Sequence, residues 1–148
     1  MSEELIQGRK YFTIDEAEKL LPEVTKLLTQ VQITKLKIEA LSRARELLQI
    51  SIGASAPEGN DFLVHQDIKS HKEFHKLHYE FFTIIDDLTE KGCILKDIDE
   101  GLIDFNFKFE GRNVLLCWKQ GEQKIEHWHE LDIGYEGRQK IVDLDLAK

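Results

Sequence analysis

The chain has 148 residues, with 20 Lys and Arg against 28 Asp and Glu, and a formal net charge of −8 at pH 7. Hydrophobic residues make up 41% and charged residues 32%. This composition suits a folded domain and excludes collagen-like, low-complexity and disulfide-rich chains. At this length we expect a single domain over residues 1–148.

The charge pattern and the cysteines restrict the cellular location and the binding partners that we expect. No stretch approaches the roughly 18 apolar residues of a membrane span, and the acidic start lacks the apolar core of a signal peptide. Cys93 and Cys117 fit a reducing cytoplasm, although their spacing does not show whether they lie near each other. No block of Lys or Arg stands out, so we expect no binding to duplex nucleic acid. The missing apolar span predicts that no membrane is a partner.

The first third of the chain predicts one long helix over about residues 14–51. Thr13 and Glu16 have the spacing of a capping box at its start. Apolar residues then recur in alternating steps of three and four, interrupted by the polar Thr34 and Arg45. Pro22 lies inside this pattern and is expected to kink or restart the helix, or to break it so that its halves fold back.

A second helix is predicted over about residues 66–91, after a polar loop. Its seam follows the same steps, and Gly92 suits the left-handed position just past a helix end. The two helices predict an antiparallel hairpin over residues 13–92. The first helix alone would be on the order of 55 Å long, more than the width of a compact fold, so we expect a homodimer through the helices.

The last third, residues 93–148, changes to a period of two. Ile103 to Phe109 alternates between apolar and polar residues, and Val114 to Trp118 is apolar on both faces, as in a central strand. A short strand at Ile94–Lys96 and another from Lys124 to Leu131 complete an antiparallel β-meander over about residues 94–131. The predicted class is therefore α+β, with a helical hairpin followed by a small sheet.

Three histidines of the second helix form the clearest candidate site. His71, His75 and His78 are spaced i, i+4, i+7, which places them on one stripe beside the apolar seam. Imidazoles at i and i+4 can bind one transition-metal ion such as Zn, Fe, Cu or Ni, with Glu39 or Glu46 of the first helix as a further ligand. Boundary histidines can also simply hydrogen-bond, and clustered imidazoles can act as a pH switch.

A second pair of histidines lies in the last predicted strand. His127 and His129 are two residues apart, so they share a face of the sheet. If that face is turned toward the helices, these two and the three helical histidines can converge on one metal site. Each of these two groups of histidines can equally have a purely structural role.

A third set of residues suggests acid/base chemistry. His129 could act as an acid/base oriented by Asp132 or Asp104, with Arg138 binding an anionic substrate. The same carboxylates can cap turns or be neutralised by Arg138. No Walker motif, serine elbow or HExxH motif accompanies them, and neither cysteine has a CxxC partner.

Three stretches together resemble a family of small prokaryotic proteins, domain of unknown function 2203. They run from Tyr11 to Pro22, from Gly92 to Phe105, and from Gly111 to Gln139. The resemblance implies a fold and a candidate site but no established activity. The family pattern is carried by six residues of this chain that lie in the sheet and the loop after it: Asp97, Asp104, Trp118, His129, Asp132 and Arg138.

The sequence therefore supports three hypotheses about function. The first is a metal-binding protein that uses the histidine cluster. The second is a non-catalytic oligomerisation or adaptor module built on the helices. The third is an enzyme with His129 as the acid/base, acting on a small-molecule ligand that the sequence does not identify.

Overall fold

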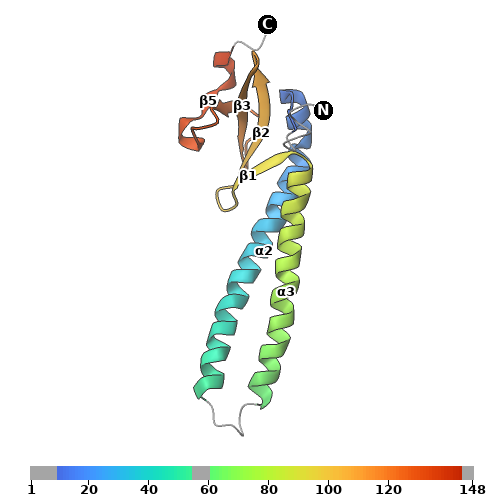
Figure 1. Cartoon of the computed structure of the whole chain (residues 1–148), viewed down its shortest axis with the longest axis vertical. Helices are drawn as coiled ribbons and strands as arrows, with labels where there is room; N and C mark the ends of the chain where they lie inside the picture. The colour runs from blue at the N-terminus through green and yellow to red at the C-terminus, as the bar shows by residue number, and fades with distance from the viewer. Residues whose placement is uncertain (1–9, 55–60, 145–148) are drawn as a thin grey trace. The chain divides into compact units, whose positions relative to one another are not determined.

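The computed structural model describes residues 10–54 and 61–144. Two long α-helices, α2 (Ile14–Ala54) and α3 (Asp61–Glu90), are followed by an antiparallel sheet of five short strands (Figure 1). The strands are β1 (Cys93–Asp97), β2 (Leu102–Phe109), β3 (Arg112–Lys119), β4 (His127–His129) and β5 (Gln139–Lys140), and they lie in that order. Two short 3-10 helices, η2 (Tyr135–Gly137) and η3 (Ile141–Leu144), flank β5. The predicted α+β class, with a helical hairpin before a meander, is confirmed.

α2 begins with the predicted capping box. The backbone N–H of Glu16 donates to the Thr13 hydroxyl at 3.1 Å, and the backbone N–H of Thr13 donates to the Glu16 carboxylate at 2.9 Å. The helix then continues through Pro22, so the alternative of a break at this residue is wrong. Pro22 lies on the exposed side of α2. None of the described helices has a stretch long and apolar enough to cross a membrane.

The chain divides into two compact units, residues 1–29 with 85–148 and residues 30–84. In the first unit, Phe12 packs edge-on against Phe105 of β2 with ring centroids 5.2 Å apart. Gly92 has φ of 91°, the left-handed conformation predicted for a residue just past α3. Its backbone also lies close to the Phe12 ring, so a side chain at this position would collide with it.

The second unit contains the facing parts of α2 and α3. Its two polar seam positions are accommodated in different ways. The Thr34 hydroxyl donates to the Gln30 carbonyl at 2.8 Å, which satisfies a buried polar group. Arg45 stacks its guanidinium over the Phe74 ring at 4.9 Å.

The sheet differs from the predicted meander at its far edge. β4 has three residues rather than the predicted run from Lys124 to Leu131, and the sequence pattern missed β5. β5 pairs with β4 through His127 opposite Lys140 and Trp128 opposite Gln139. This pairing makes β4 an inner strand and so fixes the histidine-bearing strand on both sides.

Candidate functional site

Strand register brings four polar residues to one face of the sheet. Asp104 of β2 lies directly opposite Cys117 of β3, and Cys117 lies opposite His127 of β4. Residues directly opposite in an antiparallel pair project from the same face, and residues two apart in one strand do too. His129 therefore shares this face with Asp104, Cys117 and His127, whereas Trp128 projects from the other face.

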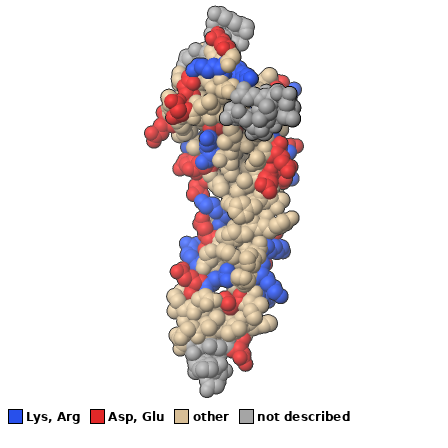
Figure 2. All heavy atoms as spheres, viewed as in Figure 1, with Lys and Arg blue, Asp and Glu red and all other residues tan. Residues whose placement is uncertain are grey.

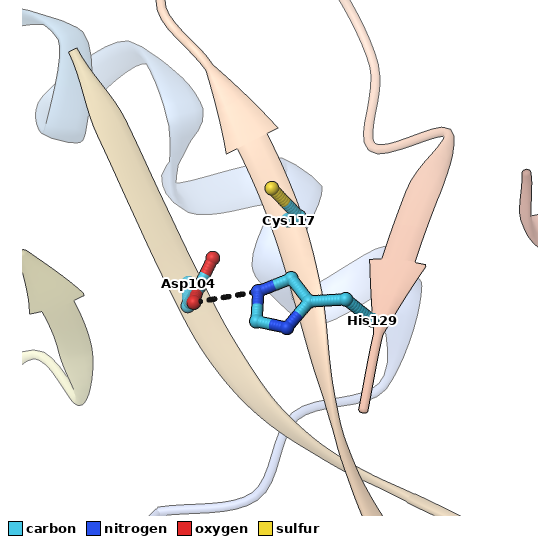
Figure 3. Close-up of side chains that lie close together, drawn as sticks. All are labelled: Asp104, Cys117 and His129. Atoms are coloured by element: carbon cyan, nitrogen blue, oxygen red, sulfur yellow. Dashed lines mark hydrogen bonds and ion pairs between the residues drawn. The ribbon is translucent and has the colours of Figure 1, made fainter. Parts of the chain in front are cut away.

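Three of these side chains form a close group (Figure 3). The possible ligand atoms of Asp104, Cys117 and His129 all lie within 4.8 Å of one another. The His129 Nε2 atom lies 2.9 Å from the Asp104 carboxylate. The exposed fractions are 1% for Asp104, 1% for Cys117 and 3% for His129. A carboxyl group, a thiol and an imidazole thus meet where water screens charges little.

The hydrogen bonds of the His129 ring determine which nitrogen faces the group. The Nδ1 atom lies 2.8 Å from the backbone carbonyl of Glu130, and because a carbonyl can only accept, Nδ1 carries a proton. Nε2 is then the nitrogen directed at Asp104. The hydrogen bond to Asp104, followed by that to Cys117, raises the pKa of His129 to about 10, so the ring is an imidazolium paired with Asp104 at neutral pH.

A pocket of about 260 Å³ opens over this group. Its floor includes Asp104, Cys117 and His129, and its walls include Lys96 and Asp132. Apolar and aromatic side chains supply most of the remaining surface: Leu102, Leu131, Ile133 and Tyr135. The three buried groups therefore border a hollow of the kind in which small molecules bind.

A family model described as "Uncharacterized conserved protein (DUF2203)" matches residues 10–141. The chain belongs to the DUF2203 family. The resemblance predicted from its three sequence stretches is thereby confirmed, and the matched region contains all three members of the buried group. No curated protein and no solved structure matches the chain.

In this DUF2203 protein, Arg138 is held by a carboxylate of its own chain. Its Nη2 atom donates to both carboxylate oxygens of Glu122 at 2.9 Å, and its guanidinium stacks over the Tyr135 ring at 4.8 Å. Glu122 also lies 3.6 Å from the Nδ1 atom of His127. Arg138 and His127 thus both lie beside Glu122, whereas Asp132 is exposed at the wall of the pocket.

The helical histidines lie in the second unit and contact one another. The Nε2 atoms of His71 and His75 are 3.0 Å apart, and His78 donates from Nδ1 to the Phe74 carbonyl at 3.1 Å. Arg45 of α2 lies 2.8 Å from the Nδ1 atom of His71. Because a guanidinium only donates, Nδ1 of His71 must be the acceptor, and the single proton of the neutral ring sits on Nε2.

This arrangement bears on the metal site predicted there. A metal ion bound to Nε2 of His71 would move the ring proton to Nδ1, where it would point at the Arg45 guanidinium. Metal binding by His71 and His75 therefore requires Arg45 to move away. The convergence of the helical histidines with His127 and His129 stays a prediction.

Cys117 is the member of the group that the sequence did not single out. It lies in a strand that is apolar on both faces, where a cysteine reads as a small hydrophobic residue. Pairing of Asp104 with Cys117 sets the site, and this follows from the two-residue turn at Glu110 and Gly111, where both residues have positive φ. Counting outward from that turn would have placed Asp104 and Cys117 opposite each other.

Proposed function

We propose that this protein binds a transition-metal ion through Asp104, Cys117 and His129. The observation that carries the proposal is the approach of their donor atoms to within 4.8 Å in a buried position. Ligands of a tetrahedral Zn²⁺ at 2.0–2.3 Å lie about 3.5 Å apart, so small side-chain rotations are enough to close the set around an ion.

The chemistry of the donors favours a transition metal over Mg²⁺ or Ca²⁺. A thiolate, an imidazole and a carboxylate are ligands of Zn²⁺ and Fe²⁺, and also bind Ni²⁺ and Cu ions, whereas Mg²⁺ and Ca²⁺ prefer oxygen alone. The hydrogen bond from Nδ1 of His129 to the Glu130 carbonyl is the outer contact that commonly orients a metal-binding histidine.

The number of ligands suggests a site that binds a substrate. Three protein ligands leave a fourth position, and the pocket lined by Lys96 and Asp132 lies beside the group. Structural zinc sites are closed by four protein ligands, while catalytic ones keep one position open for water or substrate. A bound metal would supply Lewis acidity or an activated water at this position.

A metal-free acid/base role for His129 has less support. Both ring nitrogens are engaged, Nδ1 by the Glu130 carbonyl and Nε2 by Asp104. A substrate would have to displace Asp104 from Nε2, whereas a metal ion would replace the Nε2 proton and bind Nε2 and the Asp104 carboxylate together. Arg138, the predicted anion-binding residue, is already paired with Glu122.

Two further proposals concern the setting of the protein. Cys117 must stay reduced to bind a metal, which supports a reducing compartment such as the cytoplasm. Self-association through the helices remains compatible with the metal site, and exposed apolar side chains such as Leu36 and Phe82 favour it.

Metal analysis of untagged protein tests the proposal. Protein reconstituted with Zn²⁺, Fe²⁺, Ni²⁺ or Co²⁺ and then desalted should retain about one ion per chain, and Co²⁺ should show a thiolate-to-metal charge-transfer band. Cys117→Ser and His129→Gln should lose the ion and the band. Cys93→Ser is the matched control, because Cys93 is also buried but projects from the opposite face of the sheet.

Two results would contradict the proposal. Retention below about 0.1 ion per chain for every metal would rule the site out. Retention that survives Cys117→Ser but is lost when His71, His75 and His78 are all replaced by alanine would move the metal to the helical histidines. Far-ultraviolet circular dichroism of each variant shows whether its fold is intact.

A further inference from the structure

The hairpin of residues 30–84 leaves a strip of apolar surface uncovered. Ile33 and Leu47 of α2 are 48% and 65% exposed, and Phe62 and Tyr79 of α3 are 70% and 75% exposed. The face in Figure 2 shows the same character, with uncharged side chains over much of the helices and charged ones gathered mostly toward the edges. Exposed aromatic side chains of this size are unusual on a surface that has no partner.

A groove marks one face of this hairpin. It has a volume of about 410 Å³ and is lined by Ile33 and Lys37 on one side and by Tyr79, Glu80 and Thr83 on the other. The α2 wall continues beyond Ile33 and Lys37 at steps of three and four, through Ala40 and Ala44 to Leu47. Small alanine side chains at the centre of this stripe let another helix approach closely.

We infer that a second copy of this chain covers the groove. The two hairpins then lie side by side and are related by a two-fold axis that runs parallel to their helices. In this arrangement α2 of each copy lies on α3 of the other, and the two hairpins form a four-helix bundle. The same surface serves on both copies, as a two-fold interface requires.

Charge favours this occupant and this axis. Lys37 and Glu80 stand on opposite walls of the groove, at the same level of the hairpin. A two-fold axis along the hairpin exchanges the walls, so Lys37 of each copy meets Glu80 of the other. A two-fold axis across the hairpin would instead lay α2 on α2 in opposite directions, so that Lys37 would no longer meet Glu80 of the other copy.

A second pair of opposite charges falls in register with the first. Arg45 contacts His71 and Gln49 contacts Asp67, so a step forward along α2 corresponds to an equal step back along α3. Arg43 is therefore level with Glu73, and the same two-fold axis brings these residues of opposite copies together.

The available area matches what a stable dimer needs. Residues 30–54 of α2 span about 37 Å at 1.5 Å per residue. Two helices about 10 Å apart present a strip about 20 Å wide, which gives roughly 700 Å² per copy, close to the roughly 800 Å² per partner of a standard interface. Each of the three helical histidines comes one residue after a position of the seam that faces α2, whereas Glu73 and Glu80 each come one residue before such a position. The histidines therefore lie on the other side of α3, outside this interface.

Light scattering on a size-exclusion column tests the inference with the full chain. Wild type should elute with about twice the monomer mass of 17.3 kDa. Lys37→Glu and Glu80→Lys should each raise the dimer dissociation constant about tenfold, and the double variant should restore dimerisation, because the opposite charges then meet again. Glu46→Lys is the control, since Glu46 is exposed and follows the seam residue Arg45 by one position, which places it on the side of α2 away from the groove.

The double variant Lys37→Glu with Glu80→Lys keeps the inference testable even if one single variant folds poorly. It must recover both the helical content and the dimer mass of wild type. A monomer at micromolar concentration overturns the inference. A dimer that is indifferent to both single substitutions, or a larger oligomer, overturns it too. Metal content is measured in parallel and should stay unchanged in every variant, because Lys37 and Glu80 lie outside the unit that contains Cys117.

Discussion

Replacing Asp104 with asparagine removes the negative charge that faces His129 in the buried group. The two side chains are 2.9 Å apart and at most 3% exposed, so solvent screens the pair little. In metal-free protein the substitution leaves a buried imidazolium without its counter-ion, or forces it to lose its proton. Breaking a buried pair from one side costs about 3–5 kcal/mol, a large part of the total stability of a domain.

The size of this loss depends on pH, and the raised pKa of His129 determines whether the loss grows or shrinks as pH rises. Its folded-state pKa is raised to about 10, above the ordinary value of 6.5, so Asp104 stabilises the protein fully below pH 6.5. The contribution declines as pH rises from 6.5 toward 10, where folded protein also loses the proton. The difference in stability between wild type and Asp104→Asn should therefore shrink across this range.

Urea unfolding in the presence of a chelator measures the effect. The variant should unfold at lower urea than wild type at pH 6, with an unchanged dependence on denaturant. The double variant Asp104→Asn with His129→Gln should recover much of the loss, because two neutral amides can replace the ion pair. A single-variant loss below about 1 kcal/mol at pH 6, or a loss that grows with pH, would refute the reasoning.

Three other predictions follow from contacts elsewhere in the chain. Arg45→Gln should strengthen Ni²⁺ binding by His71 and His75, because the glutamine amide can turn its oxygen toward the Nδ1 proton of His71. Calorimetry on a Cys117→Ser background measures this affinity, and an unchanged value would mean that Arg45 does not oppose the metal. Burial raises the pKa of the Cys93 thiol to about 11, so stability should fall between pH 9 and 11, and Cys93→Ala should flatten that fall in urea titrations; parallel curves would contradict this. Thr13→Ala should lower the free energy of unfolding by about 1 kcal/mol through loss of the cap on α2, and a change below about 0.3 kcal/mol would show that the cap contributes little.

Periodicity predicted the architecture well because burial of one face imposes it along a whole element. The alternating steps of three and four located both long helices. α2 extends to Ala54 rather than ending near residue 51, and α3 begins at Asp61 rather than near residue 66. The short strand β5 has two residues and no apolar alternation, so nothing in its sequence marked it. Its formation depends on pairing with β4, a long-range contact that local patterns do not encode.

The candidate site was predicted in part and from separate clues. Asp104 and His129 were singled out for acid/base chemistry, and the structure places them in contact. Cys117 was not, because its strand gave no polar signal. The contact between Arg45 and His71 was also beyond the sequence, since helical spacing shows which residues share one helix but not which residues of two helices lie at the same level.

The placement of Cys93 and Cys117 has a consequence for how the protein meets oxidants. They project from opposite faces of the sheet, and β2 lies between their strands. The two thiols therefore cannot form a disulfide with each other within the chain. An oxidant that reached Cys117 would convert it to a sulfenic acid, or join it to an external thiol such as glutathione. Either product removes the Cys117 sulfur as a donor beside Asp104 and His129, so the metal binding proposed for this group should be lost when the protein is oxidised.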